Sequence, residues 1–188
     1  MVTIRQVSSE DLQRIIDVFA GVAWPLPMDD VPALAERLGW TPWVFDNGET
    51  MPGRYNNGLP VSWPQSNFGS LKEGDPSLPA QTAIRGGEMS VVDLGITDDL
   101  EDVGPVTAEA RRSLREAYDM LVKQVDLIMG VKSAKSSYGT SRMWDLPNGG
   151  RIHVVLIADM GVNLKVSSKW MADLERAEAH HDEIEQPD

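Results

Sequence analysis

The three histidines are the first side chains to test for acid–base or metal chemistry, because imidazole titrates near neutral pH and is the commonest metal ligand. His180 and His181 lie in an acidic C-terminal stretch, where a pair of metal ligands would be held poorly. His153 lies within RIHVVLIAD, an apolar strand pattern that favours a hydrogen-bonded histidine of the core or of a sheet face. No His-x-x-x-His or His-Glu-x-x-His spacing occurs, so the sequence gives little support to a zinc enzyme.

The nucleophiles and carboxylates form no recognisable catalytic set. The chain has no cysteine, and no Gly-x-Ser-x-Gly motif places a serine beside a base. Asp93 and the acidic run at 98–102 supply carboxylates, but the run precedes a predicted helix and is expected in a solvated turn. Arg85-Gly86-Gly87 lacks the lysine and further glycines of a phosphate-binding loop and predicts a bend. We therefore expect no catalytic residue, no cofactor, no metal and no enzymatic activity.

Charge and composition set limits on the partners. The formal net charge is −12 and the pI is about 4.6, so the surface should repel phosphate backbones and we expect no nucleic-acid partner. The acidity is compatible either with solubility alone or with a surface that attracts a basic partner. The N-terminus lacks the pattern of a signal peptide, and no apolar stretch is long enough for a membrane span. These features predict a cytoplasmic protein without membrane contacts.

Two periodicities divide the chain into helices and strands. Apolar residues at helical spacing predict helices at 8–23, 30–38, 107–129 and 168 to about 180. Strand patterns cover 40–46, 88–96, 136–145, 151–159 and 162–168. Asn148-Gly149 predicts a hairpin turn, and Pro42 indicates either an edge position for the first strand or the start of that strand. Apolar residues on both faces of 152–158 indicate a strand that is covered on each side.

The predicted fold is α+β, an antiparallel sheet of four to six strands with helices packed on it. A chain of 188 residues without internal repeats fits one domain with a buried core, and we assign that domain to residues 1–180. Residues 181–188 have too little apolar content to pack and are expected to form an acidic flexible tail.

Residues 48–87 show no sustained periodicity and contain seven glycines and five prolines. A long irregular loop of this kind is uncommon in a compact domain and is usually functional. Its aromatic residues lie among arginine, asparagine and glutamine, a composition typical of protein-binding surfaces. The candidate partner-binding residues are Arg54, Tyr55, Asn56, Asn57, Trp63 and Phe68 in the loop, and the acidic Asp98 and Asp99. An alternative stays open, in which Trp63 and Phe68 fold back and hold the loop on the core.

Three segments carry a resemblance to known proteins: WPLPMDDVPALAERLGW, RMWDLPNGGRIHVVL and GVNLKVSSKWMADLERAE. They resemble actinobacterial immunity proteins, which are encoded beside polymorphic toxins and neutralise them. Within that group they are similar to immunity factors of the kind that accompanies tuberculosis necrotizing toxin, a secreted NAD glycohydrolase. The similarity covers about fifty residues at each end of the chain, and its motifs are structural, namely a helix start and a hairpin. No inhibitory residue is therefore transferred from the family.

The resemblance implies a cytosolic antitoxin that binds the catalytic domain of its cognate toxin as a one-to-one heterodimer and blocks the NAD site. Two other functions remain open. A secretion chaperone is also small, acidic and cytosolic, but it would bind an unfolded or helical export segment. An enzyme or ligand-binding domain could use the long loop as a lid, and thermal stabilisation by nucleotides would reveal it.

Overall fold

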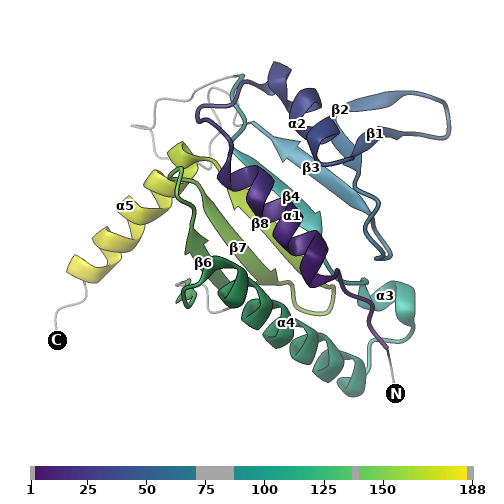
Figure 1. Cartoon of the computed structure of the whole chain (residues 1–188). Coiled ribbons are helices and arrows are strands. Elements are labelled where there is room, and N and C mark those ends of the chain that lie inside the picture. The colour runs from purple at the N-terminus through teal and green to yellow at the C-terminus, as the bar shows by residue number, and fades with distance from the viewer. Residues whose placement is uncertain (1–2, 71–86, 137–139, 186–188) are drawn as a thin grey trace.

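The structure, a computed structural model, describes residues 3–70, 87–136 and 140–185. These residues form one antiparallel sheet of eight strands in the order β1-β2-β3-β4-β8-β7-β6-β5, with helices packed on it (Figure 1). The strands are β1 (Thr41–Val44), β2 (Thr50–Asn56), β3 (Gln65–Gly69), β4 (Val91–Gly95), β5 (Ala134–Lys135), β6 (Ser141–Asp145), β7 (Arg151–Leu156) and β8 (Val162–Ser167). The helices are α1 (Ser9–Ala20), the 3-10 turn η1 (Met28–Asp30), α2 (Val31–Arg37), α3 (Leu100–Val103), α4 (Ala108–Met129) and α5 (Lys169–Glu185). The predicted α+β class is confirmed, but the strand count exceeds the four to six expected.

Two strands that the sequence pattern did not reveal, β2 and β3, lie within the segment expected to be irregular. β3 pairs with both β2 and β4, so this segment extends the sheet. The expected loop at 48–87 is therefore wrong for 50–56 and 65–69, and 71–86 lie outside the described residues. Gly53 in β2 has a φ of +78°, and a Cβ there would lie 2.7 Å from the carbonyl oxygen of Phe68. Strands that contain proline and glycine lack a regular alternation of apolar and polar residues, so the sequence pattern did not reveal them.

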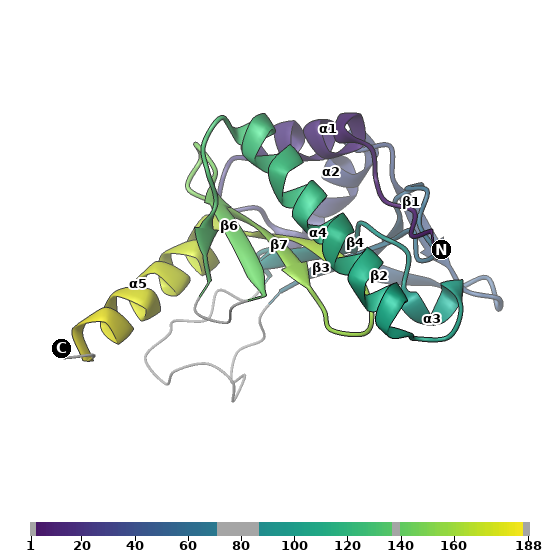
Figure 2. The same ribbon diagram turned by 90° about the horizontal axis from the view of Figure 1, so that it is seen from below.

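Helices α1, α2 and α4 lie together on one side of the sheet (Figure 2). Alternate strand residues belong to the same buried core as these helices, among them Val92, Leu94, Val154, Leu164 and Val166. The predicted apolar face of α4 is buried at Ala110, Leu114, Ala117, Leu121 and Val125. The side chains of Ser8 and Thr107 cap α1 and α4, each accepting a hydrogen bond from the backbone N–H three residues later.

Predictions about individual strands are also confirmed. β1, which contains Pro42, is an edge strand, and β7 lies between β8 and β6 with buried residues on both faces. The β6–β7 hairpin turns at Asn148-Gly149, where Gly149 has a φ of +88°. The Asn148 side-chain amide donates to the carbonyl oxygens of Phe19 and Val22, each at 2.8 Å. The turn is thereby bonded to the C-terminal end of α1.

The C-terminal helix α5 begins directly after β8 and extends away from the body of the molecule, apart from α1, α2 and α4 (Figures 1 and 2). It continues to Glu185, beyond the expected boundary near 180, so the tail predicted at 181–188 is helical as far as it is described. Residues 186–188 lie outside the described part of the chain. None of the helices that the structure describes is long and apolar enough to cross a membrane.

Candidate functional site

The face of the sheet opposite α1, α2 and α4 carries a line of polar side chains, which we call the polar row. Cross-strand pairing aligns its members from β2 to β7, in the order Arg54, Asn67, Asp93, Lys165 and His153. The row follows from strand alternation, because the neighbours of Asp93, Lys165 and His153 along each strand belong to the core. At the β2 end, Arg54 Nε donates a hydrogen bond to Asn67 Oδ1 at 3.1 Å.

The β7 end of the polar row is covered by α5 through Glu175. One carboxylate oxygen lies 2.9 Å from His153 Nε2 and the other accepts from Ser167 Oγ at 3.0 Å. Lys165 Nζ and an Arg151 nitrogen lie 3.6 and 3.5 Å from this carboxylate. Burial alone would raise the pKa of Glu175, but the hydrogen bond and charge of His153, the charge of Lys165 and the Ser167 hydroxyl together lower this pKa to about 2. His153 is thus the hydrogen-bonded sheet-face histidine that the sequence favoured.

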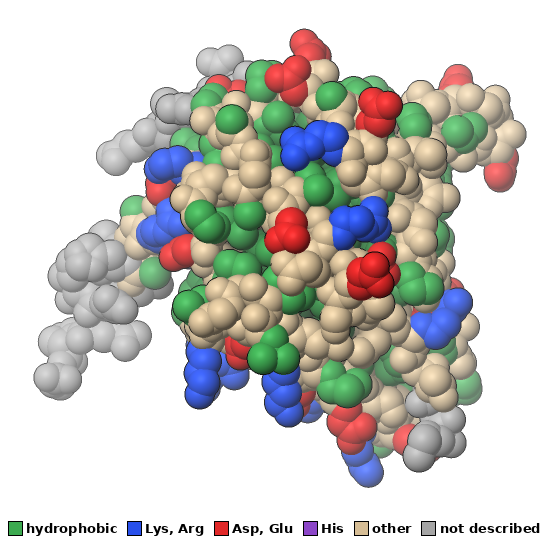
Figure 3. Space-filling model, in the orientation of Figure 1, with side chains coloured by type: hydrophobic (Ala, Val, Ile, Leu, Met, Phe, Trp, Pro, Cys, Tyr) green, Lys and Arg blue, Asp and Glu red, His purple; other side chains and the backbone are tan. Residues whose placement is uncertain are grey.

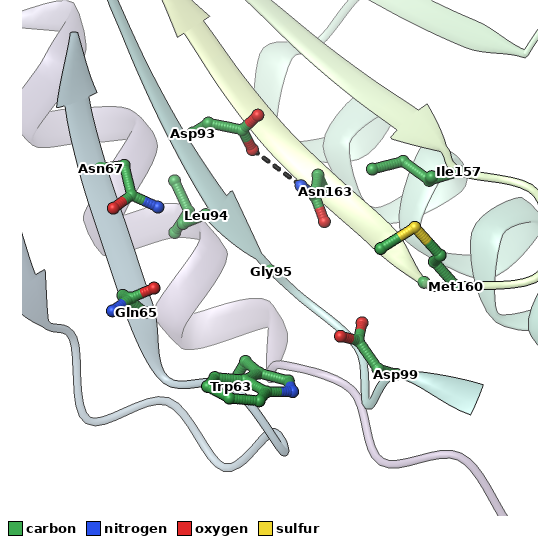
Figure 4. A pocket seen from close by; sticks show the side chains of 11 residues that line it. Trp63, Gln65, Asn67, Asp93, Leu94, Gly95, Asp99, Ile157, Met160 and Asn163 are labelled. Atoms are coloured by element: carbon green, nitrogen blue, oxygen red, sulfur yellow. Dashed lines mark hydrogen bonds between the residues drawn. The ribbon is translucent and has the colours of Figure 1, made fainter. Parts of the chain in front are cut away.

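The middle of the same face opens into a cavity of about 320 Å³ at the end of β4 (Figure 4). Its polar lining consists of Trp63, Gln65, Asn67, Asp93, Asp99 and Asn163. Trp63 borders the cavity with 52% of its surface exposed, and Asp99 lies at the end of the cavity beside Met160. Asp93 and Asn163 project from adjacent strands, and Asn163 Nδ2 donates to Asp93 Oδ1 at 2.8 Å.

Backbone hydrogen bonds hold the walls of the cavity together. The Asp99 N–H donates to Ser62 Oγ at 2.8 Å, which joins the acidic turn to the segment before β3. The next N–H, that of Leu100, donates to the carbonyl oxygen of Met160 at 2.8 Å, which joins the turn to the β7–β8 loop. Gly161 permits this approach, because a Cβ there would lie 2.8 Å from Asp99 Oδ1. The cavity is therefore formed by three segments that are bonded to one another.

The cavity presents negative charge and hydrogen-bond acceptors. Burial raises the pKa of Asp93, an effect that is partly offset by the Asn163 hydrogen bond and by the charge of Lys165. Burial also raises the pKa of Asp99, and the neighbouring charges of Asp102, Glu101 and Asp98 raise it further. Both carboxylates are therefore less stable in the ionised form than they are in water. A ligand that carries positive charge or hydrogen-bond donors would relieve that cost.

Four of the eight predicted partner-binding residues lie at the surface of this region. Trp63 and Asp99 line the cavity. Arg54 contacts Asn67, which lines the cavity, and its guanidinium carbon lies 6.0 Å from the centre of the Phe45 ring. Asn56 is exposed at the end of β2, where its side-chain oxygen accepts from the Gly58 N–H.

The other four are buried, contrary to the expectation of an exposed loop and a solvated acidic turn. Strand alternation directs Tyr55 and Phe68 into the core, where their rings meet edge to face at 5.6 Å. Asn57 is buried and donates to Ser66 Oγ. Asp98 is 1% exposed, because its carboxylate accepts from the backbone and side chain of Arg5 at 2.9 and 3.0 Å. Of the two residues in the fold-back alternative, Phe68 packs on the core and Trp63 does not.

Asp93, Asn163, Gln65 and Asn67 were not among the predicted binding residues, yet they line the cavity. A signal for two of them exists in the sequence. In VVDLG and VNLKV, Asp93 and Asn163 are polar residues at the outward position of an alternating strand. Their proximity depends on the pairing of β4 with β8, two strands that are far apart in the sequence.

No group of three or more His, Asp or Glu side chains that could hold a metal ion occurs in the described part of the chain.

Comparisons with known proteins assign the chain to a family, but they give no function for it. No curated protein and no solved structure gives a significant match. A family model described as a family of unknown function, DUF6301, matches residues 10–168. That span runs from α1 to the end of β8 and includes every residue that lines the cavity. The chain therefore belongs to the DUF6301 family.

Proposed function

We propose that this protein binds a protein partner through the polar face of its sheet, and that the partner is a toxin which it neutralises in the cytoplasm. It does so as a one-to-one complex and without chemistry of its own. The observation that carries the binding proposal is the cavity beside Trp63, in which a half-exposed indole adjoins carboxylates and side-chain amides. Tryptophan at a concave, partly polar site is typical of the residues that dominate interface energies.

Exposed apolar side chains lie in the neighbouring β1–β2 hairpin. Val44, Phe45 and Met51 of the β1–β2 hairpin are 58%, 39% and 47% exposed. Arg54 connects Phe45 to the cavity, because it contacts both the Phe45 ring and Asn67. A surface with an aromatic cavity and an apolar flank suits a folded protein partner better than a small molecule.

The distribution of charge supports the same face. On the opposite side, acidic and basic side chains are interspersed (Figure 3). The cavity instead contains Asp93 and Asp99, and none of the residues that line it is basic. Together with the net charge of −12, this favours a partner with a basic surface. A toxin active site that binds the pyrophosphate of NAD has such a surface, and the resemblance to immunity proteins favours a toxin.

The test uses the toxin domain encoded in the adjacent reading frame, purified and mixed with this protein. We expect a one-to-one complex by analytical ultracentrifugation and loss of the toxin's activity, NAD hydrolysis if the resemblance holds. Trp63→Ala should weaken the affinity by about 30-fold or more, the loss typical of a central interface tryptophan. Leu127→Ala is the matched control, because Leu127 is 83% exposed on α4, on the helical side of the sheet.

Equal losses of affinity in the two variants, or no loss in either, would contradict binding through the polar face. If the protein bound an unfolded export segment and not a folded catalytic domain, the antitoxin proposal would fail and the chaperone alternative would replace it. An adjacent reading frame without a toxin domain would count against the toxin as partner, and the face itself would then be tested with the partner that co-purifies.

A further inference from the structure

The geometry points to an arginine side chain of the partner as the occupant of the cavity. Its guanidinium group would lie against the Trp63 ring and face the carboxylates of Asp93 and Asp99. This inference rests on the proposed function, because it names the chemical group that the partner inserts. Size, charge and shape support it separately.

The size of the cavity favours one side chain over a larger ligand. Its volume of about 320 Å³ is at the lower end of the range for pockets that hold drug-sized molecules, roughly 300–1,000 Å³. A dinucleotide such as NAD needs a larger pocket than this cavity provides. One long side chain from a partner that covers the mouth would fit within this space.

The charge of the cavity favours a cation over an anion or a neutral sugar. The carboxylate of Asp99 makes no hydrogen bond or ion pair with any residue that the structure describes, and its charged neighbours are Asp98, Glu101 and Asp102. Lys165, the basic neighbour of Asp93, is instead directed to Glu175 at 3.6 Å. A sugar could donate hydrogen bonds to these carboxylates, but it would leave their negative charge uncompensated.

The shape of the lining favours guanidinium over ammonium. The indole of Trp63 offers a flat surface on which a planar guanidinium can stack, with a cation–π contribution. Asp93 projects from β4 and Asp99 from the turn after it, so the two carboxylates lie at different sides of the cavity. The side-chain oxygens of Gln65 and Asn163 add neutral acceptors, whereas Asn67 Oδ1 already accepts from Arg54 Nε. Five donors in a fixed plane can meet such dispersed acceptors, whereas an ammonium offers three donors at one point.

The experiment titrates the free protein with three short capped peptides that differ only in the central residue, Gly-Arg-Gly, Gly-citrulline-Gly and Gly-Lys-Gly. Citrulline keeps the shape of arginine and removes the charge. We expect saturable binding of the arginine peptide, followed by NMR of the tryptophan indole N–H signals, and at least about fivefold weaker binding of the other two. Asp99→Asn should weaken binding of the arginine peptide by at least about fivefold, and Trp63→Ala should weaken it further. Glu116→Gln, an equal loss of charge on exposed α4, should change nothing.

Three results would overturn the inference: no saturable binding of the arginine peptide, equal binding of the citrulline peptide, or equal binding of the lysine peptide. Thermal unfolding of each variant checks that it is folded. If Trp63→Ala does not fold, the isosteric Asp99→Asn variant carries the test. The proposed function is tested separately by the toxin domain. If Trp63→Ala weakens the toxin complex while the arginine peptide fails to bind, partner binding stands and the arginine assignment falls.

Discussion

At the scale of single residues, Glu175 connects the C-terminal helix to the sheet. Its carboxylate meets His153 at 2.9 Å and lies within 4 Å of Arg151 and Lys165. Arg151 is nearly buried, so it depends on Glu175 and Asp145 for its charge partners. A buried cation that loses its partner costs more than the pair contributes when it is intact.

We therefore predict that Glu175→Gln lowers the free energy of unfolding by about 1–3 kcal/mol near neutral pH. The folded pKa of about 2 lies below the ordinary value of 4.5, so the carboxylate stabilises the fold above pH 4.5. This stabilisation is lost progressively as the pH falls from 4.5 to about 2, and only below that pH is the carboxylate protonated in both states. Urea unfolding at several pH values should show the two proteins converging over that range.

Glu178→Gln is the control, since Glu178 is exposed on the same helix and should have little effect at any pH. A difference between Glu175→Gln and the wild type that stays constant down to pH 2 would show that the effect comes from packing and not from charge.

Residue environments were only partly predictable from the sequence. The hydrogen-bonded histidine at 153 followed from the strand pattern, whereas the sequence left open whether Trp63 is exposed or packed on the core. The burial of Asp98 could not be predicted, because it depends on Arg5, a partner more than ninety positions away. An acidic run looks solvated until a distant cation is known to cover one member of it. The cavity is of the same kind, since its walls come from three separate segments.

At the scale of elements, the β6–β7 turn is bonded to α1 by a single side chain. Asn148 donates to two carbonyl oxygens, those of Phe19 and Val22, at the end of the helix. Its own Oδ1 accepts from the Gly150 N–H at 3.2 Å, which is the local role expected of asparagine in a tight turn. The long-range contact supplies hydrogen-bond donors to carbonyl oxygens at and just beyond the last turn of α1, where carbonyl groups commonly lack a partner within the helix.

Asn148→Asp separates the two roles of Asn148. Aspartate keeps the oxygen that supports the turn, but it removes the donor and places negative charge beside two carbonyl oxygens. We predict a loss of about 1–3 kcal/mol in the free energy of unfolding, at least as large as that of Asn148→Ala. Chemical denaturation measures both, and an aspartate variant as stable as the wild type would show that the contact to α1 contributes nothing.

Elements with strong periodicity were predictable, and those that depend on pairing were not. The apolar stripe of α4 and its Thr107 cap define Ala108–Met129 almost to the residue. β2 and β3 are strands because neighbours on each side pair with them, in spite of Pro52 and Gly53. β5 spans two residues, too few for any pattern. Helix α5 was predicted shorter than it is, because its end carries few apolar residues.

At the scale of the whole molecule, the net charge of −12 should accelerate encounters with a basic partner. We predict that the association rate constant with the toxin domain falls by roughly tenfold between low and physiological salt, since screening shortens the range of attraction to about 8 Å. The dissociation rate should change much less, because contacts inside a formed interface are poorly screened. Stopped-flow mixing over a salt series measures both rates. A salt effect confined to dissociation would contradict long-range attraction.

The two margins of the sheet bear on how the protein behaves at high concentration. On one side, β1 carries Pro42, which has no N–H to donate, and its pairing with β2 is irregular between Pro42 and Val44. On the other side, β5 offers two paired residues. Neither margin is a good template for strand addition by a second molecule. A protein whose large sheet is flanked in this way should resist fibril formation, even though α1, α2 and α4 all lie on one face of the sheet.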